Sequence, residues 1–291
     1  MSTATRPDEA IAVRDFSISY RVDGELVPAV SDVTFSLSRS ERLAVVGESG
    51  SGKTTLATAI AGLLPHGVAH VEYADARIAG RDVDLRVGHR VIPISQLGVS
   101  MIFQDAMTSL DPVASIGHQF RTVLASGERR SRRDVRGEAA HWIDRVGIPR
   151  PERVLGLRPY ELSGGMRQRV MIALAMCSKP AVLIADEPTS ALDVAVSQRI
   201  MSLILELTAE LGTAVIAITH DIDLAQRYLD RTLVLHQGIV QDFCATDGLS
   251  APERSAYTRA LVKCVPRLRD FDRTSLPTLA ATMRGTGMGG A

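Results

Sequence analysis

Two segments near the start of the chain, residues 11–20 and 27–38, partly alternate apolar and polar positions. The apolar positions are Ile11, Val13, Phe16 and Ile18, then Val30, Val33, Phe35 and Leu37. A period of two is typical of a β-strand with one buried face. Asp23-Gly24 between the segments is a hairpin-turn signal, so the pattern predicts an antiparallel pair.

Short continuous apolar runs indicate strands that are buried on both faces. They lie at 43–46, 181–185 and 213–218, and residues 69–103 contain further short strands. Segments 55–64 and 194–211 have helical character instead. Strands that alternate with helices predict a parallel sheet covered by helices, which is an α/β core.

From about 115 to 160 the pattern becomes helical and strongly charged, and Trp142 lies at helical spacing from Val146. We expect Trp142 to anchor the core of this segment. The basic residues gather at Arg129, Arg130, Arg132, Arg133 and Arg136, and Glu128, Asp134, Glu138 and Asp144 lie among them. This mixture favours a solvated helix face over a nucleic-acid surface.

These patterns predict how the chain is divided. Residues 1–10 form an N-terminal tail and 11–245 the α/β domain, with the helical block at about 105–168 inserted between its two halves. Residues 246–291 form a separate C-terminal piece. Its glycine-rich end, 284–291, is expected to be disordered.

Composition narrows the possible functions. The chain of 291 residues has 33 basic and 33 acidic residues, so it gives no support to binding of nucleic acid or membrane surfaces. Its three cysteines, Cys177, Cys244 and Cys264, have no metal-ligand spacing and suit a reducing cytoplasm. The polar start is not a signal peptide, and no apolar run approaches the ~20 residues that cross a bilayer.

The stretch Gly47–Thr54 fits G-x-x-x-x-G-K-[ST], the phosphate-binding P-loop. Its glycines let successive backbone N–H groups turn inward around an anion. Lys53 is placed to reach the terminal phosphates and the Thr54 hydroxyl to bind Mg²⁺. The strand before the loop and the helix after it provide the context that the motif requires.

Two acids, Asp186 and Glu187, end the apolar run 181–185. Ligand sites of parallel sheets lie at the carboxyl ends of the strands, so we expect both acids to face the P-loop. Asp186 would hold Mg²⁺, and Glu187 would polarise the water that attacks the γ-phosphate.

A second anion site is predicted at Leu162–Arg169, where Ser163 is a good helix N-cap and Gly164 and Gly165 permit close backbone approach. One ATP cannot use two phosphate-binding loops that lie far apart in one subunit. A dimer in which this loop covers the ATP of the other subunit is the simplest solution.

The ordered set of motifs resembles an ABC transporter nucleotide-binding subunit over about residues 11–245. The matching elements are Walker A at 47–54, the Q-loop Gln104, the signature 162–166, Walker B at Asp186-Glu187, the D-loop 190–193 and the switch His220. The resemblance implies a RecA-like P-loop NTPase core, an antiparallel β subdomain, an inserted helical subdomain and a head-to-tail dimer. ATP would lie between Walker A and the opposing signature.

The same resemblance implies roles for individual residues. Tyr20 would stack on adenine, Gln104 would contact Mg²⁺ or the attacking water, and His220 would contact the γ-phosphate. Asp193 would lie at the dimer interface. The residues implied around the phosphates, besides Gly47, are Ser49, Gly50, Ser51, Gly52, Lys53, Thr54 and Thr55.

Two stretches, Phe103–Pro112 and Ala256–Pro266, resemble the ATPases of dipeptide, oligopeptide and nickel importers. Ala106 and Ala256 each replace a proline that is usual in that group. The implied protein hydrolyses ATP at the cytoplasmic face of a bacterial membrane. Its partners would be a second ATPase, two permease subunits and, indirectly, a solute-binding protein. An exporter, or an ABC ATPase that acts on nucleic acid or the ribosome, remains an alternative.

Overall fold

The computed structural model describes residues 8–65, 67–86, 98–105, 109–125, 131–190 and 193–264. The expectations for residues 1–7, Ala106 and 284–291 lie outside these ranges. Within them, no helix combines the length and the apolar character needed to cross a membrane.

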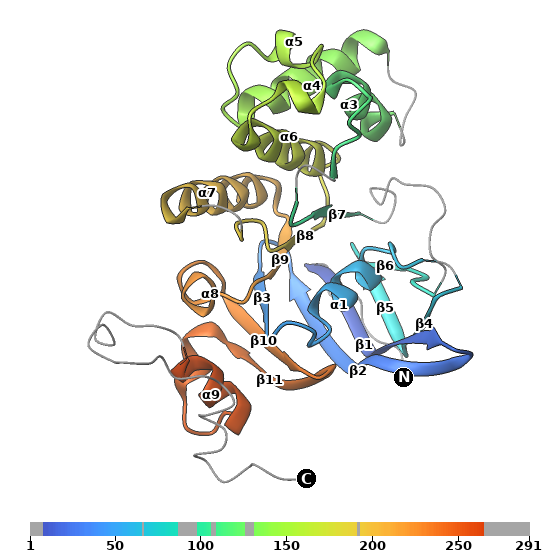
Figure 1. Cartoon of the computed structure of the whole chain (residues 1–291), viewed down its shortest axis with the longest axis vertical. Helices are drawn as coiled ribbons and strands as arrows, with labels where there is room; N and C mark the ends of the chain where they lie inside the picture. The colour runs from blue at the N-terminus through green and yellow to red at the C-terminus, as the bar shows by residue number, and fades with distance from the viewer. Residues whose placement is uncertain are drawn as a thin grey trace.

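Strands predominate in the first part of the described chain, and helices and strands alternate between about residues 164 and 236 (Figure 1). The strands are β1 Glu9–Val22, β2 Glu25–Ser38, β3 Arg42–Val46, β4 Ala69–Glu72, β5 Asp75–Ile78, β6 Arg81–Asp82, β7 Val99–Ile102, β8 Val182–Asp186, β9 Ala214–Ile218, β10 Arg231–His236 and β11 Ile239–Ala245. The α-helices are α1 Lys53–Ile60, α3 Ile116–Leu124, α4 Arg132–Arg145, α5 Pro151–Val154, α6 Gly164–Cys177, α7 Val194–Leu211, α8 Ile222–Tyr228 and α9 Ala256–Lys263. Two 3₁₀-helices, η2 Pro159–Glu161 and η3 Thr246–Ser250, complete the set for the described residues.

The sheet has an antiparallel part and a parallel part. Its strand order is β6-β5-β1-β2-β11-β10-β3-β9-β8-β7, and β4 also pairs with β1. β1 and β2 form the predicted antiparallel hairpin, and β10, β3, β9, β8 and β7 run parallel. Asp23 and Gly24 at the hairpin turn both have positive φ, 51° and 89°, as a primed turn requires.

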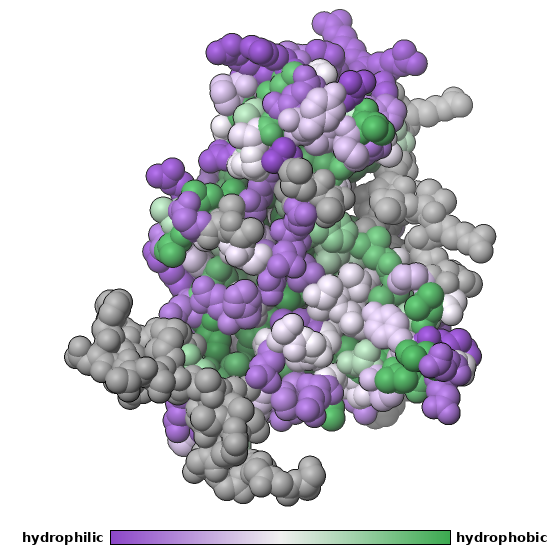
Figure 2. Space-filling view, viewed as in Figure 1, coloured by the Kyte–Doolittle hydropathy of each residue, from purple (hydrophilic) through white to green (hydrophobic). Residues whose placement is uncertain are grey.

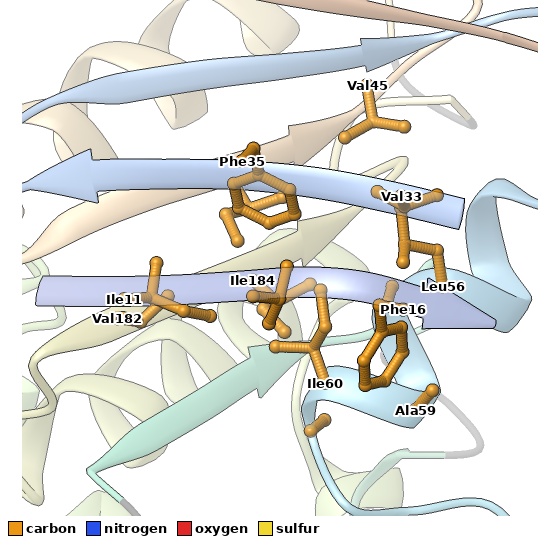
Figure 3. Close-up of a cluster of buried hydrophobic side chains, with 14 of the residues drawn as sticks. Ile11, Phe16, Val33, Phe35, Val45, Leu56, Ala59, Ile60, Val182 and Ile184 are labelled. Carbon is orange, nitrogen blue, oxygen red and sulfur yellow. The ribbon is translucent and has the colours of Figure 1, made fainter. Parts of the chain in front are cut away.

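Side chains of the parallel strands point alternately into different cores, so both faces of the sheet are covered as expected. In β8, Val182 and Ile184 join a core with the antiparallel strands and α1, shown in Figure 3. Leu183 of the same strand packs on the opposite side with the helical block. This burial on two faces explains why these strands are continuous apolar runs.

Helices α3, α4 and α5, which lie between β7 and β8 in sequence, form a block at one end of the molecule (Figure 1). Trp142 is buried with Ile143 in the core of this block, as predicted. Arg132, Arg133 and Arg136 are exposed, and hydrophilic residues gather at this end (Figure 2). Helix α6 packs on both α3 and α4 and continues to Cys177, so we propose that the helical unit extends beyond about 168.

Two expectations differ from the structure. The helix predicted at 55–64 ends at Ile60, because Gly62 takes a positive φ of 69° and its N–H bonds back to the Ala59 carbonyl. The segment after 245 is not separate over its described part. Leu249, Tyr257 and other residues of η3 and α9 share a core with one face of β3 and β9, opposite the face that packs with α1.

Candidate nucleotide site

The P-loop connects β3 to α1 and packs closely on neighbouring strands. A Cβ atom at Gly47 would lie 2.1 Å from the Leu235 carbonyl oxygen, and one at Gly52 would lie 2.8 Å from that of Ala29. Both glycines have positive φ, 154° and 101°. Glycine is therefore required at both positions, since any side chain would meet backbone and strain the loop.

Lys53, the first residue of α1, is buried and folded onto its own loop. Its Nζ donates to the carbonyl oxygens of Gly47 at 2.9 Å and Glu48 at 2.6 Å. Ser51 Oγ lies 3.5 Å from the same nitrogen. Burial lowers the pKa of Lys53, and the nearby carboxylates oppose this effect. The ammonium is thus held at the loop by backbone carbonyl oxygens.

A cleft of about 670 Å³ opens above the P-loop, which is within the size range of small-molecule sites. It brings together residues from separate regions of the chain. The lining residues are Pro28, Ala29, Ser49, Gly50, Gly52, Lys53, Thr54, Thr55, Gln104, Asp186, Glu187, His220 and Gln237.

Thr54 and Asp186 meet at the floor of this cleft. The Thr54 hydroxyl donates to Asp186 Oδ1 at 3.4 Å, although the residues are 132 positions apart in sequence. Burial raises the pKa of Asp186, and the Thr54 hydrogen bond partly offsets that increase. A buried carboxylate and a neighbouring hydroxyl together provide suitable oxygen ligands for a hard cation.

The Glu187 carboxylate lies between two polar side chains. Its Oε1 is 3.0 Å from His220 Nδ1, and its Oε2 accepts from Gln104 Nε2 at 3.1 Å. The backbone of Glu187 has a positive φ of 44°, fixed by an N–H bond to the Ile218 carbonyl on β9. Three of the predicted catalytic side chains, Gln104, Glu187 and His220, are therefore assembled by the ends of β7, β8 and β9, and the fourth, Lys53, begins α1.

Other predicted residues lie outside the cleft lining. The Tyr20 hydroxyl donates to Thr55 Oγ1 at 3.4 Å, which places this tyrosine beside the start of α1. Ser163 caps α6 by accepting from the Met166 N–H, and Asp193 caps α7 by accepting from the Val196 N–H. Gly164 and Gly165 begin α6, and none of the three signature residues lines its own chain's cleft.

Sequence reasoning missed three lining residues, Pro28, Ala29 and Gln237. Gln237 lies in the turn between β10 and β11, where the Gly238 N–H bonds to the Ser51 carbonyl at 3.0 Å. The turn was readable from Gln237-Gly238 after an apolar strand. Its place beside the P-loop follows from the order of the strands in the sheet, which no local sequence pattern predicts.

A family model described as ABC transporter matches residues 30–190. The chain belongs to the ABC transporter family. The glutathione import ATP-binding protein GsiA of Pectobacterium atrosepticum is 40% identical over 263 residues, covering 89% of this chain and 42% of that protein. The oligopeptide transport ATP-binding protein OppD of Bacillus subtilis is 35% identical over 277 residues, covering 95% of this chain and 77% of that protein. The chain thus spans about two fifths of the glutathione-import relative and about three quarters of the oligopeptide one.

Solved structures of the family agree with the ABC cassette fold. CbiO1 from Clostridium perfringens, described as part of the ABC transporter complex CbiONQ, has a TM-score of 0.66 and 26% identity over 84% of this chain and 92% of its own. A dimeric ATP-binding cassette, MJ0796, bound to ADP and phosphate, has a TM-score of 0.66 and 24% identity over 81% of this chain and 98% of its own. Membership of this family implies that the chain binds ATP.

Proposed function

We propose that this chain hydrolyses ATP to drive a bacterial importer for peptides or comparable small solutes. The observation that carries the ATPase assignment is the Glu187 carboxylate, hydrogen-bonded to both Gln104 and His220 in the cleft that also contains Lys53. A proton acceptor, two polar groups that orient it and a phosphate-binding cation are the parts that phosphoryl transfer to water needs.

In this mechanism the P-loop N–H groups and the Lys53 ammonium bind the phosphates and stabilise their charge. Glu187 accepts a proton from the attacking water, whose oxygen forms the new bond to the γ-phosphorus as ADP leaves. His220 and Gln104 hold the carboxylate, each by one hydrogen bond, so that it faces the water. A general base of this kind contributes ~10²–10⁴-fold.

Mg²⁺ is part of the proposal. Thr54 and Asp186 would hold it, with Gln104 as a further oxygen donor from the same cleft. Over the residues that the structure describes, no three His, Cys, Asp or Glu side chains gather into a metal site. Phosphate oxygens and water would complete the shell, as is usual for this cation. When bound, the metal supplies charge neutralisation at the phosphates.

We propose that two ATPase subunits pair head to tail. Ser163, Gly164 and Gly165 present a capped helix start away from their own cleft, and such a start binds anions. The partner's ATP is the ligand that this geometry suits, and Asp193 would lie at the same interface. The partner is a second copy of this chain or a related ATPase.

The import role is supported by the peptide-importer resemblance of Phe103–Pro112 and by the names of the two relatives, one for glutathione and one for oligopeptides. Two permease subunits would bind the ATPase pair at the cytoplasmic face of the membrane, and a solute-binding protein would deliver the solute. Peptides are the favoured solutes, and nickel or metal chelates are the second class within this group.

The test is ATPase activity of the full chain reconstituted with the permeases encoded beside it, with and without the cognate binding protein. We expect a binding protein loaded with a small peptide to stimulate hydrolysis several-fold over the unloaded protein. Stimulation by a nickel-loaded binding protein would redirect the solute assignment. Activity that ignores the permeases but rises with DNA or ribosomes would overturn the import role.

A further inference from the structure

Helix α9 contacts the P-loop through Tyr257. The phenol oxygen of this residue accepts a hydrogen bond from the Glu48 N–H at 3.2 Å, across 209 positions of sequence. The Tyr257 ring is buried and stacks on His236, the last residue of β10, with ring centroids 4.0 Å apart and an interplanar angle of 29°. A residue outside the nucleotide motifs thus contacts the phosphate-binding loop directly.

The start of α9 is anchored independently of the P-loop. The Ser255 N–H donates to Asp242 Oδ2 on β11 at 3.0 Å, and the Thr258 hydroxyl donates to the same oxygen. Ser255 also caps the helix by accepting from the Thr258 N–H at 3.1 Å. Thr258 itself is fully buried. Tyr257 lies between Ser255 and Thr258, which are both fixed by hydrogen bonds to Asp242. The position of its hydroxyl therefore does not depend on the P-loop.

The peptide unit between Gly47 and Glu48 is bonded on both sides. Its N–H donates to Tyr257, and its carbonyl oxygen accepts from Lys53 Nζ at 2.9 Å. A trans peptide is planar, with the N–H and the C=O pointing in opposite directions. Fixing the N–H therefore fixes the direction of the carbonyl that holds the Lys53 ammonium.

We propose that Tyr257 is a positioning residue for ATP binding, acting through the Gly47–Glu48 peptide on Lys53. Without the phenol oxygen, this peptide loses the partner of its N–H and can rotate about its neighbouring bonds. The carbonyl then no longer fixes the ammonium where the terminal phosphates bind. The C-terminal segment thereby becomes part of the nucleotide site, although it lies far from every nucleotide motif in sequence.

The first test is Tyr257→Phe in the full chain, which keeps the buried ring and its stacking on His236. The loss of one hydrogen bond predicts a rise of about three- to tenfold in the Kd for ATP. We expect the same rise in KM in the reconstituted transporter, with kcat within about twofold. Tyr160→Phe is the matched control, because this exposed phenol lies in the helical block on Arg158 and should change neither constant.

A double-mutant cycle separates positioning from a structural role. In a Lys53→Ala background, Tyr257→Phe should add less than about twofold to the Kd for ATP, since the group it positions is gone. An unchanged Kd for Tyr257→Phe alone would overturn the proposal. So would an equal effect in both backgrounds, or a fall in kcat together with Tm at constant KM.

Discussion

The Glu187 carboxylate is 3.0 Å from His220 Nδ1, and both residues follow adjacent parallel strands, β8 and β9. The histidine side chain is mostly exposed while the glutamate is largely covered. The hydrogen bond therefore fixes the carboxylate from the open side of the cleft. We therefore propose that the two residues act as one functional unit.

His220→Ala should lower kcat roughly 100-fold, because the carboxylate loses the group that orients it. In a Glu187→Gln background the same change should add little, since the proton acceptor has already been removed. Single-turnover ATP hydrolysis by the two single variants and the double variant measures this coupling. His118→Ala on α3 is the control, an exposed histidine outside the cleft. Additive losses would contradict a shared role.

Gly47→Ala should disrupt the P-loop. The new Cβ would lie 2.1 Å from the Leu235 carbonyl oxygen at a φ of 154°. Strain on the order of 1–3 kcal/mol is expected, which lowers Tm by several degrees in a chain of this size and weakens ATP binding. Gly137→Ala, which enters open space on α4, should leave Tm equal or higher. Thermal unfolding and nucleotide titration compare the two; equal Tm values would refute the close packing.

Asp186→Asn should stabilise the nucleotide-free chain at neutral pH. Burial raises the pKa of Asp186, so the folded state binds its proton more tightly than the unfolded state does. That contribution to stability is complete below the unfolded pKa and is lost as pH rises through the folded pKa. The Tm advantage of the Asp186→Asn variant over wild type should therefore be largest near neutral pH and shrink as pH falls through the raised pKa of Asp186.

The same variant should lose stabilisation by ATP with Mg²⁺, because the carboxylate that would hold the metal is gone. Thermal unfolding across this pH range, with and without the nucleotide, measures both effects. A Tm advantage for Asp186→Asn that grows as pH falls would have the wrong sign for a carboxylate with a raised pKa.

Pairing through the signature predicts complementation between two inactive variants. In a homodimer, Lys53→Ala disables each P-loop, and Ser163→Arg blocks each signature. A mixed dimer joins one intact P-loop to one intact signature, so mixing should restore up to about half of the wild-type activity per dimer. ATPase assays of the single and mixed proteins measure this recovery. No recovery in verified mixed dimers would contradict a site shared between subunits.

The parts of the site that sequence could predict are those that local chemistry defines. Gly47–Thr54 and Asp186-Glu187 were readable because phosphate binding needs particular residues at fixed spacing beside a strand end. Burial on two faces made β8 and β9 recognisable as apolar runs. The structure places Lys53, Thr54, Gln104, Asp186, Glu187 and His220 in one cleft.

The parts that sequence could not predict depend on long-range packing. Gln237 lines the cleft because β10 lies beside β3. Tyr257 contacts Glu48 because α9 packs on β11 and the Tyr257 ring stacks on His236 at the end of β10. Neither residue belongs to a chemical motif of the P-loop. Helix α9 is only 8 residues long, too short for its apolar positions to indicate which surface it covers.

The most direct test of the account is ATP turnover by Glu187→Gln. The neutral amide keeps the shape of the side chain but cannot accept the proton of water, so turnover should fall ~10²–10⁴-fold. ATP binding should be retained, since Lys53 and the P-loop are unchanged. Glu206→Gln, an exposed residue of α7 outside the ATP cleft, is the control and should behave as wild type. Wild-type turnover by Glu187→Gln would contradict the catalytic assignment on which the proposed function rests.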